Sequence, residues 1–144
     1  MQLTNFEIDG DYIAITSNVR YLDIHNCFDY VALVKDEPNQ QAELVFIANT
    51  IDCSLSKGIN GFSLLFENVE AIYEKGPDPD YPAQYIDQDK TCVDLLGFSY
   101  DGDEMMDGPL SYQSGEGLSS LIFVFVTGAE LKITATKVSL RFAE

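Results

Sequence analysis

The sequence is poor in positively charged residues, and this shortage limits what the protein can bind. It contains 8 lysines and arginines against 24 aspartates and glutamates, which leaves a formal net charge of −16 at pH 7. Nucleic acids and anionic membrane surfaces are recognised through positively charged faces. We therefore expect neither a nucleic acid nor a membrane as a partner. A basic protein or a divalent cation would be attracted instead, although such a charge can also serve only to keep a domain soluble.

Long apolar runs are absent, and cysteines are few. No stretch approaches the roughly 20 apolar residues of a membrane-spanning helix, and Met1–Glu7 has neither the basic nor the apolar region of a secretory signal. The three cysteines, Cys27, Cys53 and Cys92, are widely spaced and form no CxxC pair. We interpret them as free, buried thiols in a reducing cytosol, which predicts a cytoplasmic protein.

Motifs for catalysis and for cofactor binding are missing as well. His25 is the only histidine, so the cysteine spacings and this residue cannot make a zinc site. The sequence has no nucleophile motif of the GxSxG kind and no phosphate-binding glycine loop. Pairs of carboxylates can always be drawn from 24 acidic residues, and they carry no information here. We expect a protein that is not an enzyme and that needs no cofactor.

The segments that are present favour β-structure. The apolar fraction of 46% in 144 residues indicates one folded domain, residues 1–144, with a substantial core. The unbroken apolar run Leu121–Val126 predicts a strand buried on both faces. Thr127–Glu130 predicts a turn in which Gly128 takes a positive φ, and alternation through Glu130–Thr136 predicts the returning strand.

The end of the chain predicts an interruption in the last strand. Apolar residues occupy odd positions through Leu131 and Ala135, and even positions from Val138 to Phe142. Because strand side chains alternate between two faces, both sets can reach one core only through a bulge or a break near Thr136 and Lys137.

Other segments predict further short strands joined by polar turns. The strands are Leu3–Asp9, Tyr12–Ser17, Cys27–Lys35, Glu43–Asn49 and Cys92–Tyr100, and Gly10-Asp11 predicts a hairpin turn between the first two. The predicted connectors are Ser17–Asn26, Asp36–Gln41, Thr50–Asn60, Gly76–Gln88 and Asp101–Gly117. Gly61–Lys75 fits two strands or one bulged strand, with a short helix as the alternative. About eight short strands indicate a mainly β protein, an antiparallel β-sandwich or barrel-like sheet to which one short helix can be added.

An acidic, tyrosine-bearing tract is the candidate partner-binding region. Ten acidic residues and a single basic one, Lys90, lie between Gly76 and Glu116. Tyrosine suits an interface anchor because it offers a large area with a polar tip, and surrounding carboxylates would attract a basic protein. The alternative is that Tyr85 and Tyr100 are half-buried sheet residues beneath a charged loop. The candidate contact residues are Asp78, Asp80, Tyr81, Tyr85, Asp87, Asp89, Tyr100, Asp101, Asp103, Glu104, Asp107 and Tyr112.

Part of this tract also suggests a cation site. Asp101, Asp103 and Asp107 lie in a glycine-containing loop and could bind Ca²⁺ through oxygen ligands. The pattern is not that of an EF-hand, because Tyr112 occupies the position of the final glutamate. A calcium- or carbohydrate-binding β-sandwich module is therefore the alternative function, and a solvated acidic loop is the simpler interpretation.

The whole profile resembles that of small acidic bacterial immunity proteins, which neutralise toxins. The resemblance rests on the charge of −16, the absence of a signal and of catalytic motifs, and the acidic, tyrosine-bearing region Tyr81–Tyr112. It concerns composition, so no functional position is transferred from the family. It implies a non-enzymatic inhibitor in the cytoplasm that binds a basic partner such as a bacterial toxin. The oligomeric state is not predicted.

Overall fold

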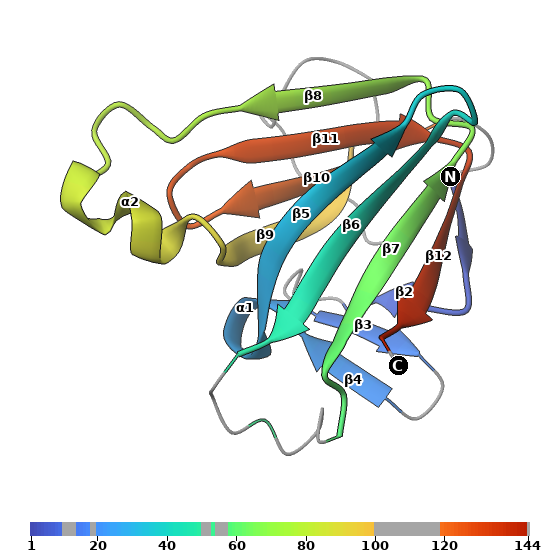
Figure 1. The fold of residues 1–144 in the computed structure, drawn as a ribbon, viewed down its shortest axis with the longest axis horizontal. Helices are drawn as coiled ribbons and strands as arrows, with labels where there is room; N and C mark the ends of the chain where they lie inside the picture. Colours follow the sequence, from blue (N-terminus) through green and yellow to red (C-terminus); the bar gives the residue numbers. More distant parts are fainter. Residues whose placement is uncertain (10–13, 18–19, 50–52, 54–57, 100–118, 144) are drawn as a thin grey trace.

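A computed structural model describes residues 1–9, 14–17, 20–49, 53, 58–99 and 119–143 (Figure 1). Across these ranges the chain forms twelve strands in three sheets and two short helices. The mainly β fold is confirmed, with more strands than the eight or so that the sequence indicates.

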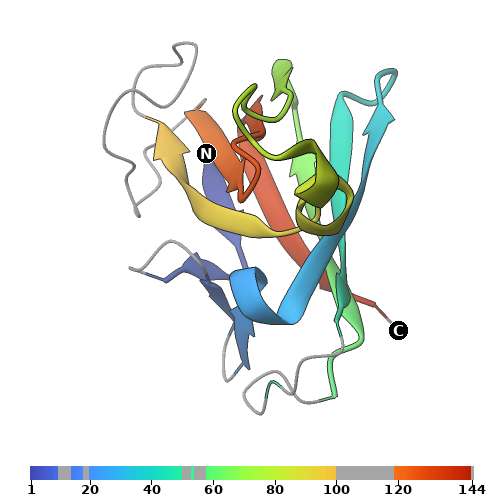
Figure 2. The ribbon, with the colours of Figure 1, turned by 90° about the vertical axis from the view of Figure 1, so that its left-hand side faces the viewer.

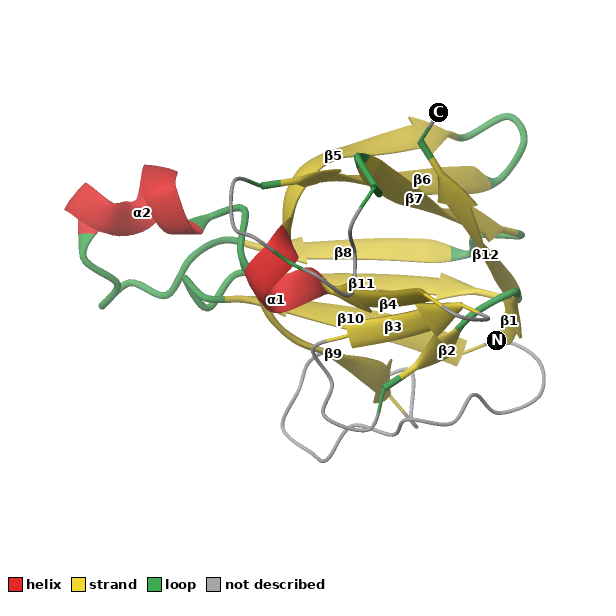
Figure 3. Cartoon of the chain, turned by 90° about the horizontal axis from the view of Figure 1, so that it is seen from below, coloured by secondary structure: helices red, strands yellow, loops and turns green. Residues whose placement is uncertain are grey.

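The two larger sheets pack face to face as the layers of a sandwich (Figure 3). The five-stranded sheet has the order β1 (Gln2–Thr4), β12 (Lys137–Phe142), β7 (Gly61–Glu67), β6 (Gln41–Ala48), β5 (Phe28–Asp36). The four-stranded sheet has the order β8 (Ala71–Lys75), β11 (Glu130–Ala135), β10 (Ser119–Phe125), β9 (Val93–Ser99). Neighbouring strands are antiparallel except β1 and β12, which pair in parallel.

A smaller sheet of β2 (Glu7–Ile8), β3 (Ala14–Ser17) and β4 (Arg20–Asp23) lies across the lower end of the sandwich in Figures 1 and 2. Helix α1 (Ile24–Cys27) follows β4 and leads into β5. Helix α2 (Ala83–Asp89) joins β8 to β9 and stands away from the sheets in Figures 1 and 3.

Aromatic side chains from both layers form the centre of the core. The rings of Phe46 and Phe62 stack with centroids 4.8 Å apart, and Phe28 meets Phe62 edge-on at 5.0 Å. Phe123 of the opposite layer lies 6.2 Å from Phe46. All four side chains are almost completely buried. Full burial of such side chains stabilises a fold by about 1.5–3 kcal/mol each, so the core dominates the stability.

The predictions for the last hairpin are confirmed. Every residue of Leu121–Phe125 in β10 is buried, as expected for a strand covered on both faces. Gly128 lies in the turn with φ of 84°, a conformation that glycine adopts without strain. The expected break occurs where β11 ends in the four-stranded sheet and β12 begins at Lys137 in the five-stranded sheet. The change of sheet lets Val138 and Leu140 enter the same core.

The first predicted strand, Leu3–Asp9, is divided at Asn5. β1 pairs with β12, whereas β2 pairs with β3 in another sheet. Asn5 has φ of 64°, and its side-chain amide donates to the Leu140 carbonyl and accepts from the Leu140 N–H, both at 2.9 Å. The side chain thus imitates one more paired residue of a strand, and asparagine tolerates the left-handed backbone that turns the chain. The predicted Gly10-Asp11 turn lies outside the described residues.

Two predicted connectors contain regular structure. Ser17–Asn26 contains β4 and most of α1, and Asp23 caps this helix by accepting from the Asn26 N–H at 2.9 Å. Leu22 and Ile24 of this segment are completely buried. Gly76–Gln88, predicted as a loop, contains most of α2, which buries no side chain and therefore gives no apolar periodicity to detect.

Gly61–Lys75 forms two strands, and the alternative helix is wrong. β7 belongs to the five-stranded sheet and β8 to the four-stranded sheet. Asn68 lies between them with φ of 55°. The alternation of Phe62, Leu64 and Phe66, all buried, is the local signal that prevails.

The interpretation of all three cysteines as free thiols is wrong. Cys27 and Cys53 form a disulfide, and Cys92 is free. The bridge spans 26 residues and depends on the meeting of α1 with the end of β6, where the Asn49 N–H donates to the Cys27 carbonyl at 3.0 Å. Disulfides are typical of oxidising compartments, so this one removes the free thiols on which the cytoplasmic prediction depended. The cytoplasmic location itself stays a prediction. Among the described helices, none is long and apolar enough to cross a membrane.

Candidate protein-interaction site

Residues 76–92 join β8 to β9, and we call them the α2 excursion. They carry Asp78, Asp80, Asp87 and Asp89 against one lysine, Lys90. Helix α2 contains no buried residue. The side chain of Asp87 is 96% exposed, and Tyr85 is 48% exposed. The excursion therefore presents the carboxylates of Asp78, Asp80 and Asp87 and the Tyr85 ring to solvent, clear of the sandwich core.

The start of the excursion is attached to the turn between β10 and β11. The Asp78 N–H donates to the Thr127 carbonyl at 2.9 Å, and the Lys75 ammonium lies 3.4 Å from the Asp78 carboxylate. That carboxylate covers Gly128 so closely that a Cβ at Gly128 would lie 2.1 Å from Asp78 Oδ2. A glycine is thus needed at this position both for its φ and for the room that Asp78 occupies.

The end of the excursion is attached to β5 and to the residue that follows β10. The Thr91 carbonyl accepts from the Tyr30 N–H of β5 at 2.9 Å. The Cys92 carbonyl accepts from the Val126 N–H, also at 2.9 Å. An element without buried side chains is therefore held at both ends by the sandwich, which limits its freedom before any partner binds.

A side-chain pair joins the two halves of the excursion. The Tyr81 hydroxyl donates to the Asp89 carboxylate, and this hydrogen bond, with the carboxylate charge, raises the pKa of Tyr81 to about 12. Asp87 and Asp89 occupy the last turn of α2, the negative end of the helix dipole, where acidic groups do not stabilise a helix. Only Lys90, 3.4 Å from Asp87, offsets this charge locally. Their position does not serve the stability of α2.

The structure brings six of the predicted contact residues together. Asp78, Asp80, Tyr81, Tyr85, Asp87 and Asp89 all belong to the α2 excursion. Tyr100, Asp101, Asp103, Glu104, Asp107 and Tyr112 lie outside the described residues, so both the rest of the tract and the calcium alternative at Asp101, Asp103 and Asp107 stay predictions. Within the described ranges, no group of three potential ligands is placed to hold a metal ion.

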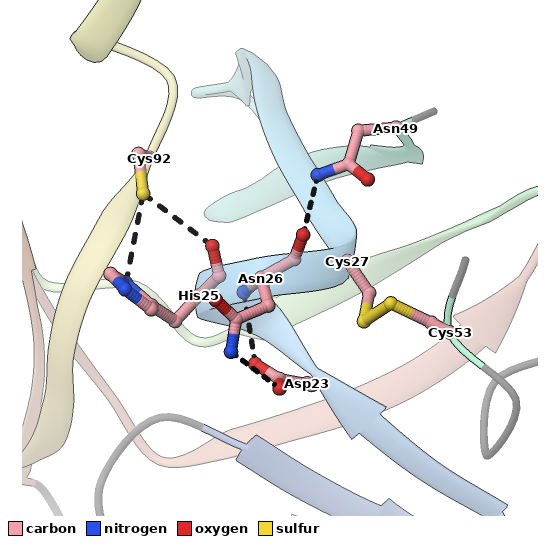
Figure 4. The surroundings of a disulfide bond; sticks show 7 residues. All are labelled: Asp23, His25, Asn26, Cys27, Asn49, Cys53 and Cys92. Carbon is pink, nitrogen blue, oxygen red and sulfur yellow. Dashed lines mark hydrogen bonds between the residues drawn. A yellow bond between two sulfur atoms is a disulfide. The ribbon is translucent and has the colours of Figure 1, made fainter. Parts of the chain in front are cut away.

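His25 and Cys92 lie together at the base of the excursion (Figure 4). His25 Nδ1 is 2.7 Å from the Val93 carbonyl, and because a carbonyl only accepts, this nitrogen carries hydrogen. It cannot then receive a proton from Cys92 Sγ, which is 3.6 Å away. The thiol lies 3.5 Å from the His25 carbonyl, to which it donates. These contacts hold α1 against β9.

The Cys92 thiol is not activated as a nucleophile in this arrangement. Burial, and then the negative charges of Asp29, Asp94, Asp89 and Asp23, raise the pKa of the thiol. A reactive cysteine needs the opposite environment, one that stabilises the thiolate. Figure 4 shows Cys92 and the Cys27–Cys53 disulfide on either side of α1.

The same four carboxylates extend the negative region beyond the α2 excursion. Asp23 ends β4, and Asp29 and Asp94 are the second residues of β5 and β9, yet the charges of all three raise the pKa of the Cys92 thiol together with that of Asp89. The sequence alone does not group them, because β9 lies far along the chain from β4 and β5.

The fold and this surface define a β-sandwich domain that bears a fixed, acidic and tyrosine-containing excursion. Compared with models of known protein families, with curated proteins and with solved structures, the chain has no match. The likeness to immunity proteins therefore stays a resemblance in composition.

Proposed function

We propose that this protein is a non-enzymatic binding domain that covers a basic surface of a partner protein with its α2 excursion. The observation that carries the proposal is that α2 buries nothing and yet is fixed at both ends. The resemblance in composition makes an immunity-type inhibitor of a bacterial toxin the particular role to test first. The charge of −16 argues against nucleic acids and membranes as partners.

The chemistry of the excursion suits such a partner in two ways. Tyr85 offers a half-exposed ring that a partner can bury at small entropic cost, as tyrosine anchors do at protein interfaces. The surrounding carboxylates, led by the 96% exposed Asp87, attract and orient a basic surface during the encounter. Attachment at both ends reduces the ordering cost of binding.

The test is capture of a partner from native lysate at low and at high salt, followed by association kinetics with the protein identified. At low salt we expect recovery of a basic partner protein in a ratio near one to one, and at high salt we expect that partner to be lost. Asp80→Asn with Asp87→Asn should lower the association rate by about tenfold at low salt, because steering by charge raises such rates by orders of magnitude. Tyr85→Ala should act mainly on dissociation.

A matched control separates local from general charge. Glu7 of β2 and Glu70 beside β8 are both exposed and lie outside the excursion. Glu7→Gln with Glu70→Gln removes the same charge as the Asp80 and Asp87 pair, and should change the rate by less than about twofold. An equal decrease of the association rate in the two double variants would show that the excursion is not the contact. Partner capture that is the same at low and high salt would show the same.

A further inference from the structure

The five-stranded sheet ends at β5, which pairs with β6 and with no other strand in the described part of the chain. Figures 1 and 2 show β5 at the outer margin of its sheet. The first part of this margin is closed, since the Tyr30 N–H donates to Thr91 at the end of the α2 excursion. The register then shifts between Tyr30 and Ala32, which places a bulge at Val31. The free margin begins after this bulge.

The hydrogen-bonding direction of the free margin follows from β6. Alternate residues of an antiparallel strand turn their N–H and C=O groups to opposite sides. The Ala48 N–H points toward β7, because it donates to the Asn60 carbonyl. By alternation Val45 and Glu43 point toward β5.

The β5 partners of these two residues are Ala32 and Val34, which therefore face β6. The residues between and after them, Leu33 and Lys35, turn their N–H and C=O groups outward. An unpaired row of this kind can accept the main chain of another strand.

The side chains beside this margin combine exposed apolar groups with negative charge. Val31 and Val34 are 52% and 54% exposed. Glu74 of β8 lies 3.4 Å from the Lys35 ammonium. The pKa of Tyr30 is raised by the burial of its side chain and, to a smaller extent, by the negative charge of Glu74. Lys35 is the kind of residue that protects an edge strand, but here its charge is matched by Glu74.

More carboxylates lie where the closed part of the margin ends. The negative charges of Asp29, Asp89 and Asp94 all raise the pKa of the Cys92 thiol. Cys92 follows Thr91, the residue that contacts β5. Acidic groups from β5, β9 and α2 therefore lie close to the closed part of the margin, and Glu74 of β8 lies beside its free part. This charge is complementary to a strand that carries lysines or arginines.

We propose that the basic partner presents an extended lysine- or arginine-bearing segment that adds to the free margin of β5 as a further strand. Its main chain pairs with the outward groups of Leu33 and Lys35, and its aliphatic side chains contact Val31 and Val34. The proposal rests on the proposed function and states how that partner is held. A second copy of this chain is disfavoured at the same margin, because each copy carries a net charge of −16.

The test uses a synthetic peptide of about seven alternating lysines and valines, a common strand length, at low salt. Its twin has N-methyl groups on the residues of one face, which removes pairing donors and keeps the charge. We expect the first peptide to slow amide exchange at Leu33 and Lys35, measured by NMR, and the methylated twin to bind at least about tenfold more weakly.

Variants of Lys35 test the same margin from the side of the protein. Lys35→Pro removes an outward N–H and leaves the hydrogen bonds between β5 and β6 in place. It should lower the affinity for the unmethylated peptide by about tenfold. Lys35→Met keeps the N–H, removes the cation, and should bind at least as well as the unchanged protein.

The outcomes separate this proposal from the proposed function. Equal binding of both peptides, with slowed exchange confined to residues 76–92, would overturn strand addition and leave the acidic contact intact. No binding of either peptide at low salt would overturn both. A dimer in sedimentation experiments that already protects Leu33 and Lys35 would show that a second copy occupies the margin, and would also overturn the proposal.

Discussion

The sandwich interior and the α2 excursion differ in what they contribute, because the first is apolar and buried whereas the second is charged and exposed. The interior is built from stacked phenylalanines that are almost completely buried. The excursion buries no side chain of its helix and carries four carboxylates. The described ion pairs each have a partner that is more than 40% exposed, so each contributes only about 0–1 kcal/mol. Stability therefore resides in the interior, and the excursion is free to serve recognition.

The strongest way to break this comparison is a cavity in the interior. Phe46→Ala removes a ring that stacks on Phe62 at 4.8 Å, and should lower the free energy of unfolding by about 3–5 kcal/mol. Tyr85→Ala in α2 should change it by less than about 0.5 kcal/mol, as surface substitutions do. Urea denaturation of both variants measures the difference. Comparable losses would mean that α2 contributes to stability after all.

The disulfide should belong to the sandwich and not to the excursion. Replacing Cys27 and Cys53 by serine removes a bridge over 26 residues, and should lower the free energy of unfolding by about 2–4 kcal/mol. Alkylation of the unreduced, unfolded protein should label Cys92 alone in mass spectrometry. Labelling at three cysteines without reductant would contradict the bridge. Partner capture through α2 should survive the double substitution at temperatures where the variant stays folded.

The attachment of the excursion can be tested with two glycines of similar backbone conformation. Gly58 has φ of 87° with no atom within 4 Å of an added Cβ, whereas at Gly128, φ 84°, the Cβ would strike Asp78. Gly58→Ala should cost about 1 kcal/mol from backbone strain alone. Gly128→Ala should cost up to about 1 kcal/mol more, because Asp78 must move.

Asp78→Ala provides the check on that difference. In the Gly128→Ala background it should remove the additional loss of stability, since the clashing carboxylate is gone. If Gly128→Ala and Gly58→Ala cost the same in thermal or chemical denaturation, the contact between Asp78 and the turn does not hold the excursion.

The smallest effect concerns the internal pair of the excursion. Tyr81 has a folded-state pKa of about 12, above the usual value of about 10 for tyrosine. Its contribution to stability is therefore fully present below about pH 10 and is lost as the pH rises through 12. Tyrosinate absorbance of the protein, minus that of Tyr81→Phe, should show a step with its midpoint near 12. A midpoint near 10 would show that Tyr81 and Asp89 do not pair in solution.

Local patterns in the sequence predict most strands of the sandwich. Phe62, Leu64 and Phe66 alternate, and Leu121–Phe125 is apolar throughout, so both segments are recognisable without knowledge of their neighbours. The change in parity after Ala135 even predicts the point at which the chain changes sheets. Six of the twelve predicted contact residues lie in the α2 excursion, and the other six lie outside the described residues, so their role in binding stays a prediction.

The errors concern features that depend on distant segments. Asn5 divides the first strand because its amide finds Leu140, 135 positions away. Cys27 and Cys53 meet because α1 reaches the end of β6. Helix α2 has no buried face to give it a period, so only its attachments to Thr127 and Tyr30 locate it.

By itself, the sequence determined that this is an acidic, mainly β protein whose strands lie where apolar residues alternate or run together. The positions of the strands are local information, because the alternation of apolar and polar side chains along a strand identifies its two faces. Tertiary structure alone decided which strands share a sheet, which cysteines pair, and that the carboxylates of four separate elements, β4, β5, α2 and β9, gather around Cys92. Those outcomes depend on how all apolar faces are buried at once, and no single segment contains that information.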